Sequence, residues 1–141
     1  AAELSGRFPR DGDAVTRSAR RFYAGTPYQW GGITPWGADC SGLVQTIFGL
    51  HGIALPRDSS QQARAGEAVD AAADALSPAD LLFFSDRPDH RITHVAISLG
   101  GPSLVHLALG RGGYRVENLA DGADPYVKAL GGRYLFARRV V

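Results

Sequence analysis

Cys40 is the only cysteine in the 141 residues, and it stands in the stretch GADCSGLV at the start of an apolar helical pattern. Apolar residues recur at helical spacing between positions 43 and 48, which predicts a helix over residues 40–50 with Cys40 in its first turn. The unpaired N–H groups of a helix N-terminus stabilise anions, so we expect them to favour a Cys40 thiolate. With Ser41 next in line, they would also hold an oxyanion formed when sulfur attacks a carbonyl. This position suits a nucleophile that has a base nearby.

Two of the four histidines, His94 and His106, are candidates for that base. They lie in the runs HVAISLG and SLVHLAL, which flank a turn at residues 100–102 and carry a wholly apolar face opposite the histidines. A hairpin centred on residue 100 places His94 directly across from His106, with Cβ atoms about 4.5 to 5.5 Å apart, whereas a register shifted by one residue puts them on opposite faces. If the pair meets Cys40, the three side chains form a nucleophile, a base and a group that orients the base. Spacing leaves open which histidine lies nearer the thiol.

The same three residues also have simpler explanations. A single cysteine at the head of an apolar helix is often a buried, inert residue. Two histidines on facing strands can be core residues whose nitrogens bond backbone carbonyls. Together with Asp39, the three side chains would also offer ligands to zinc, but the sequence lacks dense C-x-x-C or H-x-x-x-H spacing. We therefore expect neither a metal nor an organic cofactor.

A turn-rich loop, YQWGGITPWGAD, leads into the helix of Cys40. We expect no regular structure in this loop, and we expect its Trp36 to pack against the core. Asp39 and Asp58 each precede a helical pattern, where a carboxylate caps free N–H groups. His51 follows the end of a helix, where a cation is favourable, and His90 is expected in a solvated loop.

The composition excludes several classes of protein. The 15 basic and 14 acidic residues give a net charge of +1 and are spread along the chain, so we expect no basic face for nucleic acid. The longest apolar runs are far shorter than a membrane span, so we expect no membrane insertion. One cysteine cannot form an internal disulfide. The length is that of one domain with its own core.

The order of the patterns predicts the fold class. Residues 1–12 have no clear period, and we expect a linker or the remnant of a preceding region there, followed by one domain over residues 13–141. Asp13 is expected to cap a helix that ends near residue 25, and a short helix is expected from Asp58 or Ser59 to residue 65. After residue 80 the chain changes to five short β-type runs. Helices followed by strands indicate an α+β fold with an antiparallel sheet.

Six short motifs occur in order: Y-x-W-G-G at residues 28–32, D-C-S-G at 39–42, L-P-R-D-S at 55–59, D-L-L-F-F at 80–84, H-V-A-I at 94–97, and His106. Together they resemble the NlpC/P60 cell-wall peptidases, whose papain-like domains use a Cys, a His and a third polar residue that is often a second His. The resemblance covers residues 13–141, which it identifies as an NlpC/P60-like catalytic domain. It implies a papain-like α+β fold, with N-terminal helices packed on a C-terminal antiparallel β-sheet.

The resemblance also implies an activity. It is that of a cysteine endopeptidase that hydrolyses peptidoglycan stem peptides through a thioester, at the bond between γ-D-glutamate and the following diamino acid. By this likeness Cys40 is the nucleophile, His94 the base and His106 the third member of the triad. Tyr28 would border the oxyanion site together with the backbone N–H of Cys40. The residues implied to bind the L-Ala-γ-D-Glu part of the substrate are Asp39, Ser41, Asp58, Ser59 and Trp30.

Finally, the resemblance implies a bacterial setting in the periplasm, the cell wall or outside the cell, with recycling of peptides in the cytoplasm as the other setting. Members that require a free N-terminal L-Ala usually carry an SH3-like domain ahead of the catalytic one. These 141 residues contain no such domain, so the resemblance implies that preference only if a region before residue 1 supplies it. Two other functions stay open: a module that binds muropeptides without cutting them, and a thiol acyltransferase of the same superfamily.

Overall fold

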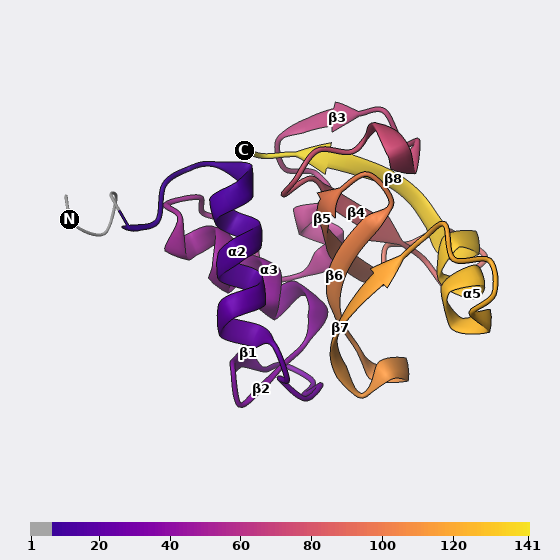
Figure 1. The fold of residues 1–141 in the computed structure, drawn as a ribbon, viewed down its shortest axis with the longest axis horizontal. Helices are drawn as coiled ribbons and strands as arrows, with labels where there is room; N and C mark the ends of the chain where they lie inside the picture. The colour runs from indigo at the N-terminus through magenta and orange to yellow at the C-terminus, as the bar shows by residue number, and fades with distance from the viewer. Residues whose placement is uncertain (1–6) are drawn as a thin grey trace.

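The computed structural model describes residues 7–141 and separates helices and strands into layers (Figure 1). The helical part comprises α2 (Gly12–Tyr23), α3 (Cys40–Leu50) and α4 (Ser59–Gln62). A small hairpin of β1 (Ile33–Thr34) and β2 (Gly37–Ala38) lies between α2 and α3 along the chain. The predicted helix over residues 40–50 is confirmed.

The main sheet is antiparallel and has six strands in the order β3-β8-β4-β5-β6-β7. The strands are β3 (Glu67–Val69), β4 (Leu81–Phe84), β5 (His94–Gly100), β6 (Ser103–Ala108), β7 (Gly113–Asn118) and β8 (Tyr134–Arg139). The remaining elements are the 3-10 helices η1 (Ala73–Ala75) and η2 (Leu109–Arg111) and the helix α5 (Pro125–Arg133). The predicted α+β fold, with helices first and an antiparallel sheet after them, is confirmed.

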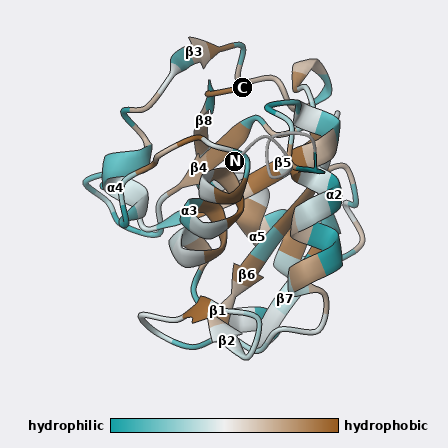
Figure 2. Ribbon diagram, turned by 90° about the vertical axis from the view of Figure 1, so that its left-hand side faces the viewer, coloured by the Kyte–Doolittle hydropathy of each residue, from teal (hydrophilic) through white to brown (hydrophobic). Residues whose placement is uncertain are grey.

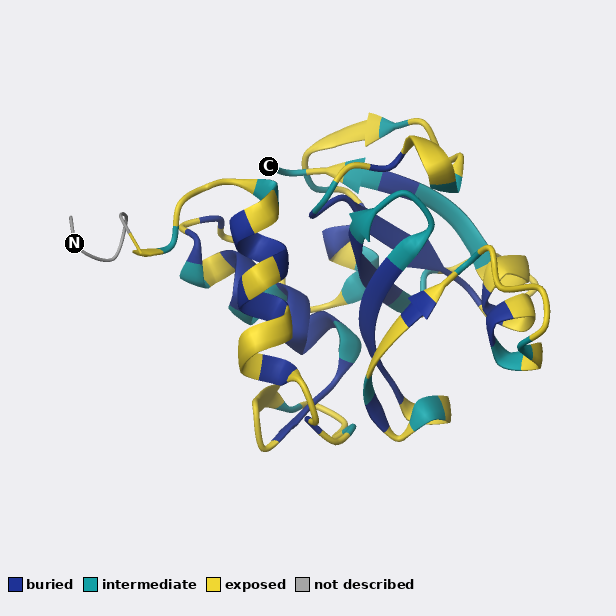
Figure 3. Cartoon of the chain, in the orientation of Figure 1, coloured by how far each residue is buried: buried dark blue, intermediate teal, exposed yellow. Residues whose placement is uncertain are grey.

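The sheet buries apolar side chains on both faces because successive residues of a strand point to opposite sides. On one face Val95, Ile97 and Val105 belong to the larger core cluster, which packs against α2 and α3. On the other face Leu104 packs with Leu130 of α5 in a smaller cluster. Figure 2 shows hydrophobic residues in α3 and along the central strands, and Figure 3 shows that these strands consist largely of buried residues.

Helix α2 has a different cap from the one expected. Asp11, and not Asp13, is its N-cap, and the Asp11 side chain accepts a hydrogen bond from the N–H of Asp13 at 2.9 Å. The backbone of Asp11 is extended, at φ −139° and ψ 132°, as a cap residue requires. Asp13 instead lies in the first turn, where its charge suits the helix dipole.

Part of the expected linker contacts the domain. Residues 1–6 of that segment lie outside the described residues, but Phe8 packs against Phe22 and His51. His51 is buried at the end of α3, where it donates from Nδ1 to the Pro9 carbonyl at 2.6 Å and accepts at Nε2 from Ser18 at 2.7 Å. His51 thus joins the N-terminal segment to two helices.

The loop before Cys40 is more regular than expected. It contains the β1–β2 hairpin, in which Thr34 pairs with Gly37, so that Pro35 and Trp36 form its two-residue turn. Side chains at such a turn point into solvent, and Trp36 is 85% exposed. The expectation that Trp36 packs against the core is therefore wrong.

Besides the β1–β2 hairpin and the two 3-10 helices, β3 and α5 were not predicted from sequence. The start of α5 follows a clear local rule: Asp124 is the N-cap, Pro125 is the first helical residue, and the Asp124 carboxylate accepts from the N–H groups of Tyr126 and Val127. The helix has only nine residues and ends with two glycines before Arg133, which hides its apolar face. Its position follows from packing against the sheet.

The N-terminus of α3 meets the preceding loop closely at Gly42. The N–H of Asp39 donates to the Gly32 carbonyl at 3.1 Å, and the Asp39 carboxylate accepts from the N–H of Gly42 at 2.8 Å. A Cβ atom at position 42 would overlap the Gly32 carbonyl and crowd the Asp39 carboxylate. The missing side chain lets the loop and helix meet, which fixes the turn that carries Cys40.

We expect Gly42→Ala to lower the free energy of unfolding by about 1–3 kcal/mol, the usual effect of forcing extra atoms into a packed site. Gly49→Ala, in the same helix, is the matched control because a Cβ there meets nothing within 4 Å. Alanine is favoured over glycine within a helix by up to about 1 kcal/mol, so the control should be neutral or stabilising. Urea unfolding measures both variants, and equal stabilities would contradict the packing described for Gly42.

Candidate active site

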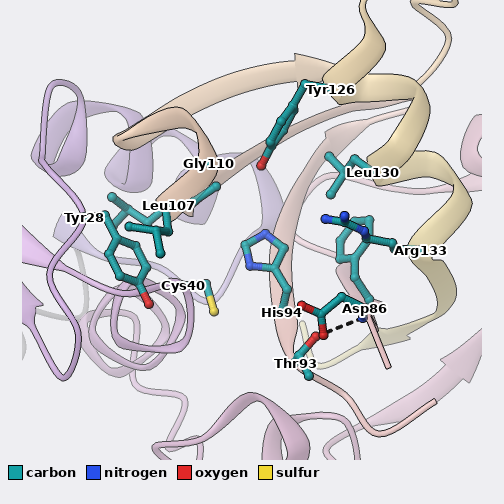
Figure 4. A pocket seen from close by; sticks show the side chains of 13 residues that line it. Tyr28, Cys40, Asp86, Thr93, His94, Leu107, Gly110, Tyr126, Leu130 and Arg133 are labelled. Carbon is teal, nitrogen blue, oxygen red and sulfur yellow. Dashed lines mark hydrogen bonds between the residues drawn. The ribbon is translucent and has the colours of Figure 1, made fainter. Parts of the chain in front are cut away.

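Cys40 is the first residue of α3, and its side chain lies in a pocket between that helix and the sheet (Figure 4). The helix packs against β5, and the backbone N–H groups of Val95, Ser41 and Cys40 itself are close enough to stabilise negative charge on the sulfur. His94, at the start of β5, lies beside Cys40 in this pocket and turns a ring nitrogen toward it (Figure 4).

His94 and His106 lie on the same face of the sheet, as expected, but they are not directly opposite one another. Strands β5 and β6 pair so that Ile97 lies opposite Val105, which makes His94 the diagonal neighbour of His106. The difference arises at the turn, where Gly100 adopts φ 102° and the pairing shifts, so the hairpin is not centred on residue 100. The rings nevertheless meet, with His94 Nε2 and His106 Nδ1 2.8 Å apart.

A buried carboxylate, Glu117 of β7, extends this contact into a hydrogen-bonded chain. His106 Nε2 lies 3.0 Å from Glu117 Oε2, and both side chains are buried. Arg111 donates to both Glu117 oxygens, at 2.9 and 3.1 Å, and to Asp124 at 2.6 Å. Burial would raise the pKa of Glu117, but the hydrogen bonds from His106 and Arg111 outweigh it and hold that pKa below its usual value. Glu117 is therefore ionised at neutral pH.

The ionised Glu117 carboxylate determines which nitrogen of each imidazole carries the proton. Because Glu117 can only accept, His106 carries its proton on Nε2 and leaves Nδ1 as an acceptor. His94 then donates from Nε2, and its own Nδ1 carries no proton. A proton-free Nδ1 next to Cys40 is the arrangement that a base for the thiol requires.

Burial controls the charge of the thiol and of the nearer imidazole. It raises the pKa of the Cys40 thiol to about 11, although hydrogen bonds from backbone N–H groups, that of Val95 above all, act in the opposite direction. Burial above all, with electrostatic contributions from the nearby His106 and Arg133, lowers the pKa of His94 to about 3. The N–H groups at the helix N-terminus act in the expected direction and favour negative charge on the sulfur, but its desolvation outweighs them. At pH 7 both groups are neutral.

Asp39, expected to bind substrate, uses its carboxylate within the protein. Arg57 donates to both oxygens at 3.0 Å, and the N–H groups of Gly31 and Gly42 donate at 3.0 and 2.8 Å. Burial would raise the pKa of Asp39, but these hydrogen bonds outweigh it and hold the pKa below its usual value. Arg57 also donates to the Ser41 hydroxyl at 2.9 Å. Asp39 thus holds the helix N-terminus and Arg57 in place.

Two pockets meet at Cys40. The first has a volume of about 290 Å³ and is lined by Cys40, His94 and residues of β6, η2 and α5. The second has a volume of about 650 Å³ and is lined by the loop before α3, the start of α4 and the loop before β5. The residues expected at the oxyanion and substrate sites all line the second pocket: Tyr28, Trp30, Asp39, Ser41, Asp58 and Ser59. Trp30 is 86% exposed.

Sequence reasoning missed Arg57, Arg111 and Glu117. Arg57 stands inside the motif at residues 55–59, between Pro56 and the expected substrate residue Asp58, and this motif is the signal that could have indicated it. Glu117 has a signal in the alternation of GYRVEN: in the β6–β7 pairing it lies opposite Leu104, on the side of the sheet that carries His106. An acidic residue at a buried position of a strand calls for a partner.

Three further expectations concern ions, membranes and one histidine. No group of three or more His, Cys, Asp or Glu side chains among residues 7–141 is arranged to hold a metal ion, so the zinc alternative finds no ligand set there. Within the same residues, no helix is long and apolar enough to cross a membrane. His90 is exposed in the loop before β5, as expected.

This sequence and this fold are similar to those of known proteins. The family profile described as NlpC/P60 family matches residues 25–128. The gamma-D-glutamyl-L-lysine dipeptidyl-peptidase of Bacillus subtilis (strain 168) is 38% identical over 112 residues, which make up 71% of this chain and 37% of that protein. This chain therefore spans less than half of that relative.

Comparison with solved structures indicates the same family. An NlpC/P60 family protein from Bacillus cereus ATCC 10987 matches with a TM-score of 0.78 and 32% identity, over 94% of this chain and 41% of that one. The NlpC/p60 domain of the peptidoglycan hydrolase SagA matches with a TM-score of 0.72 and 29% identity, over 92% of this chain and 98% of that one. The family profile covers more than half of the sequence and the fold is the one its solved members have, so this chain belongs to the NlpC/P60 family.

Proposed function

We propose that this chain is a cysteine endopeptidase that hydrolyses peptidoglycan stem peptides at the bond between γ-D-glutamate and the following diamino acid. The observation that carries the proposal is the Cys40 thiol at a helix N-terminus, beside a His94 ring whose outer nitrogen is held by His106. The names of relatives support the substrate class, since one is a gamma-D-glutamyl-L-lysine dipeptidyl-peptidase and another belongs to a peptidoglycan hydrolase.

The first half of the reaction forms a thioester. His94 Nδ1 accepts the thiol proton as the Cys40 sulfur attacks the γ-carbonyl carbon, and the Cys40 N–H with the Tyr28 hydroxyl donates to the oxyanion. The His94 imidazolium is stabilised through His106 by the charge of Glu117. It then gives its proton to the departing amine of the diamino acid as the C–N bond breaks.

Water completes the turnover. His94, neutral again, accepts a proton from water while the oxygen attacks the thioester carbon. The C–S bond breaks, the γ-carboxylic acid of the glutamate is released, and the sulfur recovers a proton from His94. In this scheme Cys40 is the nucleophile, His94 the base and acid, and His106 the residue that orients it.

The second pocket fits the acyl part of the substrate. We assign the free α-carboxylate of D-glutamate to Arg57 and the hydroxyls of Ser41 and Ser59, which lie together at this pocket. Asp58 stands at the N-cap position of α4, but its side chain makes no capping hydrogen bond, so it is free to bind the L-Ala amine. A substrate of this kind is found in the periplasm, in the cell wall or outside the cell, and during peptide recycling in the cytoplasm, and we propose these settings for the protein. If an SH3-like domain preceded residue 1, it would add contacts to the L-Ala amine.

We expect the purified chain to release L-Ala-γ-D-Glu from defined stem tetrapeptides, with Cys40→Ala lowering kcat by about 10³-fold or more. Mass spectrometry of the products identifies the bond that is cut. His90→Gln, at an exposed position, is the control and should keep the wild-type rate.

Identical fragments at identical rates from Cys40→Ala would contradict thiol catalysis. Tight binding of the peptides without turnover would favour a muropeptide-binding module instead. Transfer of the acyl group to an added amine in preference to water would favour an acyltransferase.

The raised pKa of Cys40, about 11, predicts slow alkylation at neutral pH. Iodoacetamide reacts with the thiolate, so we expect the rate constant for the unliganded protein to rise by about tenfold per pH unit between pH 7 and pH 10. His94 should add no step in this range because its pKa is about 3. The rate is read from the mass of the labelled protein with time. A rate independent of pH over this range would mean a resting thiolate–imidazolium pair.

We expect Glu117→Gln to lower kcat about 10- to 100-fold with little change in KM, because the charge behind His106 is lost while both pockets keep their residues. Asp74→Asn, which removes an exposed carboxylate from η1, is the matched control. Urea unfolding establishes that the assayed variant is folded. An unchanged kcat for folded Glu117→Gln would mean that this carboxylate serves stability alone.

A further inference from the structure

His94 determines which of the two pockets receives the leaving group. The residue that protonates the departing amine must lie on that amine's side of the broken bond. His94 lines the first pocket together with Cys40, and it does not line the second. The diamino acid therefore enters the first pocket, while the acyl part occupies the second.

The first pocket combines an apolar wall with two opposite charges. Phe84, Leu107 and Leu130 contribute apolar surface, while Arg133 at the end of α5 and Asp86 after β4 contribute the charges. Figure 4 shows the Arg133 and Asp86 side chains directed into the pocket on the side of His94.

Neither charge is neutralised by residues 7–141. The Arg133 guanidinium makes no hydrogen bond or ion pair with these residues, although its backbone carbonyl accepts from the Ser85 N–H at 3.0 Å and holds this segment next to Asp86. The Asp86 carboxylate also has no partner among them, since only its backbone N–H is bonded, to Thr93. The Arg133 charge is near enough to His94 to contribute to its lowered pKa. An arginine left free at the leaving-group site is poised to bind a carboxylate.

We propose that Arg133 binds a carboxylate of the leaving diamino acid and that Asp86 binds its ammonium group, an inference that rests on the proposed function. The apolar wall would cover the methylene groups between them. Diaminopimelate carries a carboxylate and an ammonium at the end of its side chain and so matches both charges. Lysine carries the ammonium alone. A second source of the same carboxylate is the free C-terminus of a stem tripeptide, in which the diamino acid is the last residue.

Four peptides separate these sources: L-Ala-γ-D-Glu followed by meso-diaminopimelate or by L-lysine, each with and without a terminal D-Ala. We expect kcat/KM of the wild type to favour the diaminopimelate tetrapeptide over the lysine tetrapeptide by about tenfold or more. Arg133→Gln should remove that preference and leave the lysine tetrapeptide within about twofold of wild type. Lys128→Gln, an exposed position on the same helix, controls for the loss of one charge from α5.

Arg133→Lys tests whether the effect is recognition or a change in the base. It keeps a positive charge near His94 but loses the forked geometry that binds a carboxylate at two points, so we expect a partial preference for diaminopimelate. If Arg133→Gln abolishes a preference for tripeptides over tetrapeptides instead, the bound group is the C-terminal carboxylate and the proposal stands. Equal losses for all four peptides, or a wild type that does not discriminate among them, would overturn it.

Binding to inactive protein separates this inference from the proposed hydrolysis. Calorimetry with Cys40→Ala and with Cys40→Ala/Arg133→Gln should show carboxylate-dependent affinity only when Arg133 is present. If calorimetry gives that result but the wild type cuts none of the four peptides, the proposed hydrolysis is refuted and the role of Arg133 is supported. Equal affinities of the two variants for all four peptides would refute the role of Arg133 whether or not the wild type cleaves.

Discussion

The site depends on one buried negative charge, that of Glu117. A carboxylate removed from water is unfavourable unless charge-assisted hydrogen bonds replace the lost solvation, and Arg111 and His106 supply them. Through Arg111 the same network reaches Asp124, the cap of α5, and the Arg111 guanidinium also stacks over the ring of Tyr126 at 4.1 Å. The orientation of the histidines and the position of α5, which borders the first pocket, are therefore set together.

The groups proposed to react come from different halves of the chain. The thiol stands at the N-terminal end of a helix and the imidazoles stand on the sheet, so their separation is set by how α3 packs on β5. Leu43 and Ile47 of α3 belong to the same core cluster as Val95 of β5. The same packing removes water from Cys40 and His94 and favours their neutral forms. In the proposed mechanism, charge develops only as the sulfur attacks, where the backbone N–H groups stabilise the oxyanion and Glu117, through His106, stabilises the imidazolium.

Local patterns predicted the parts of this site, and long-range geometry decided how they fit. The helix over residues 40–50 and the shared face of His94 and His106 follow from periodicity and are present in the structure. The register of the hairpin depends on left-handed conformations at Gly100 and Gly101, which no alternation of side chains reveals. Arg111, one of the two partners of Glu117, lies six residues before it across a turn, and the charge state of Cys40 depends on burial. Neither can be deduced from spacing alone.

The 141 residues contain no methionine, so the sulfur of Cys40 is the only sulfur atom in this sequence. An oxidant that attacks thiolates or thioethers therefore has a single target, and the burial that keeps this thiol protonated also slows such attack. Once formed, a sulfenic acid at this position has no second cysteine in the sequence with which to condense. Its repair requires a thiol supplied from outside these 141 residues.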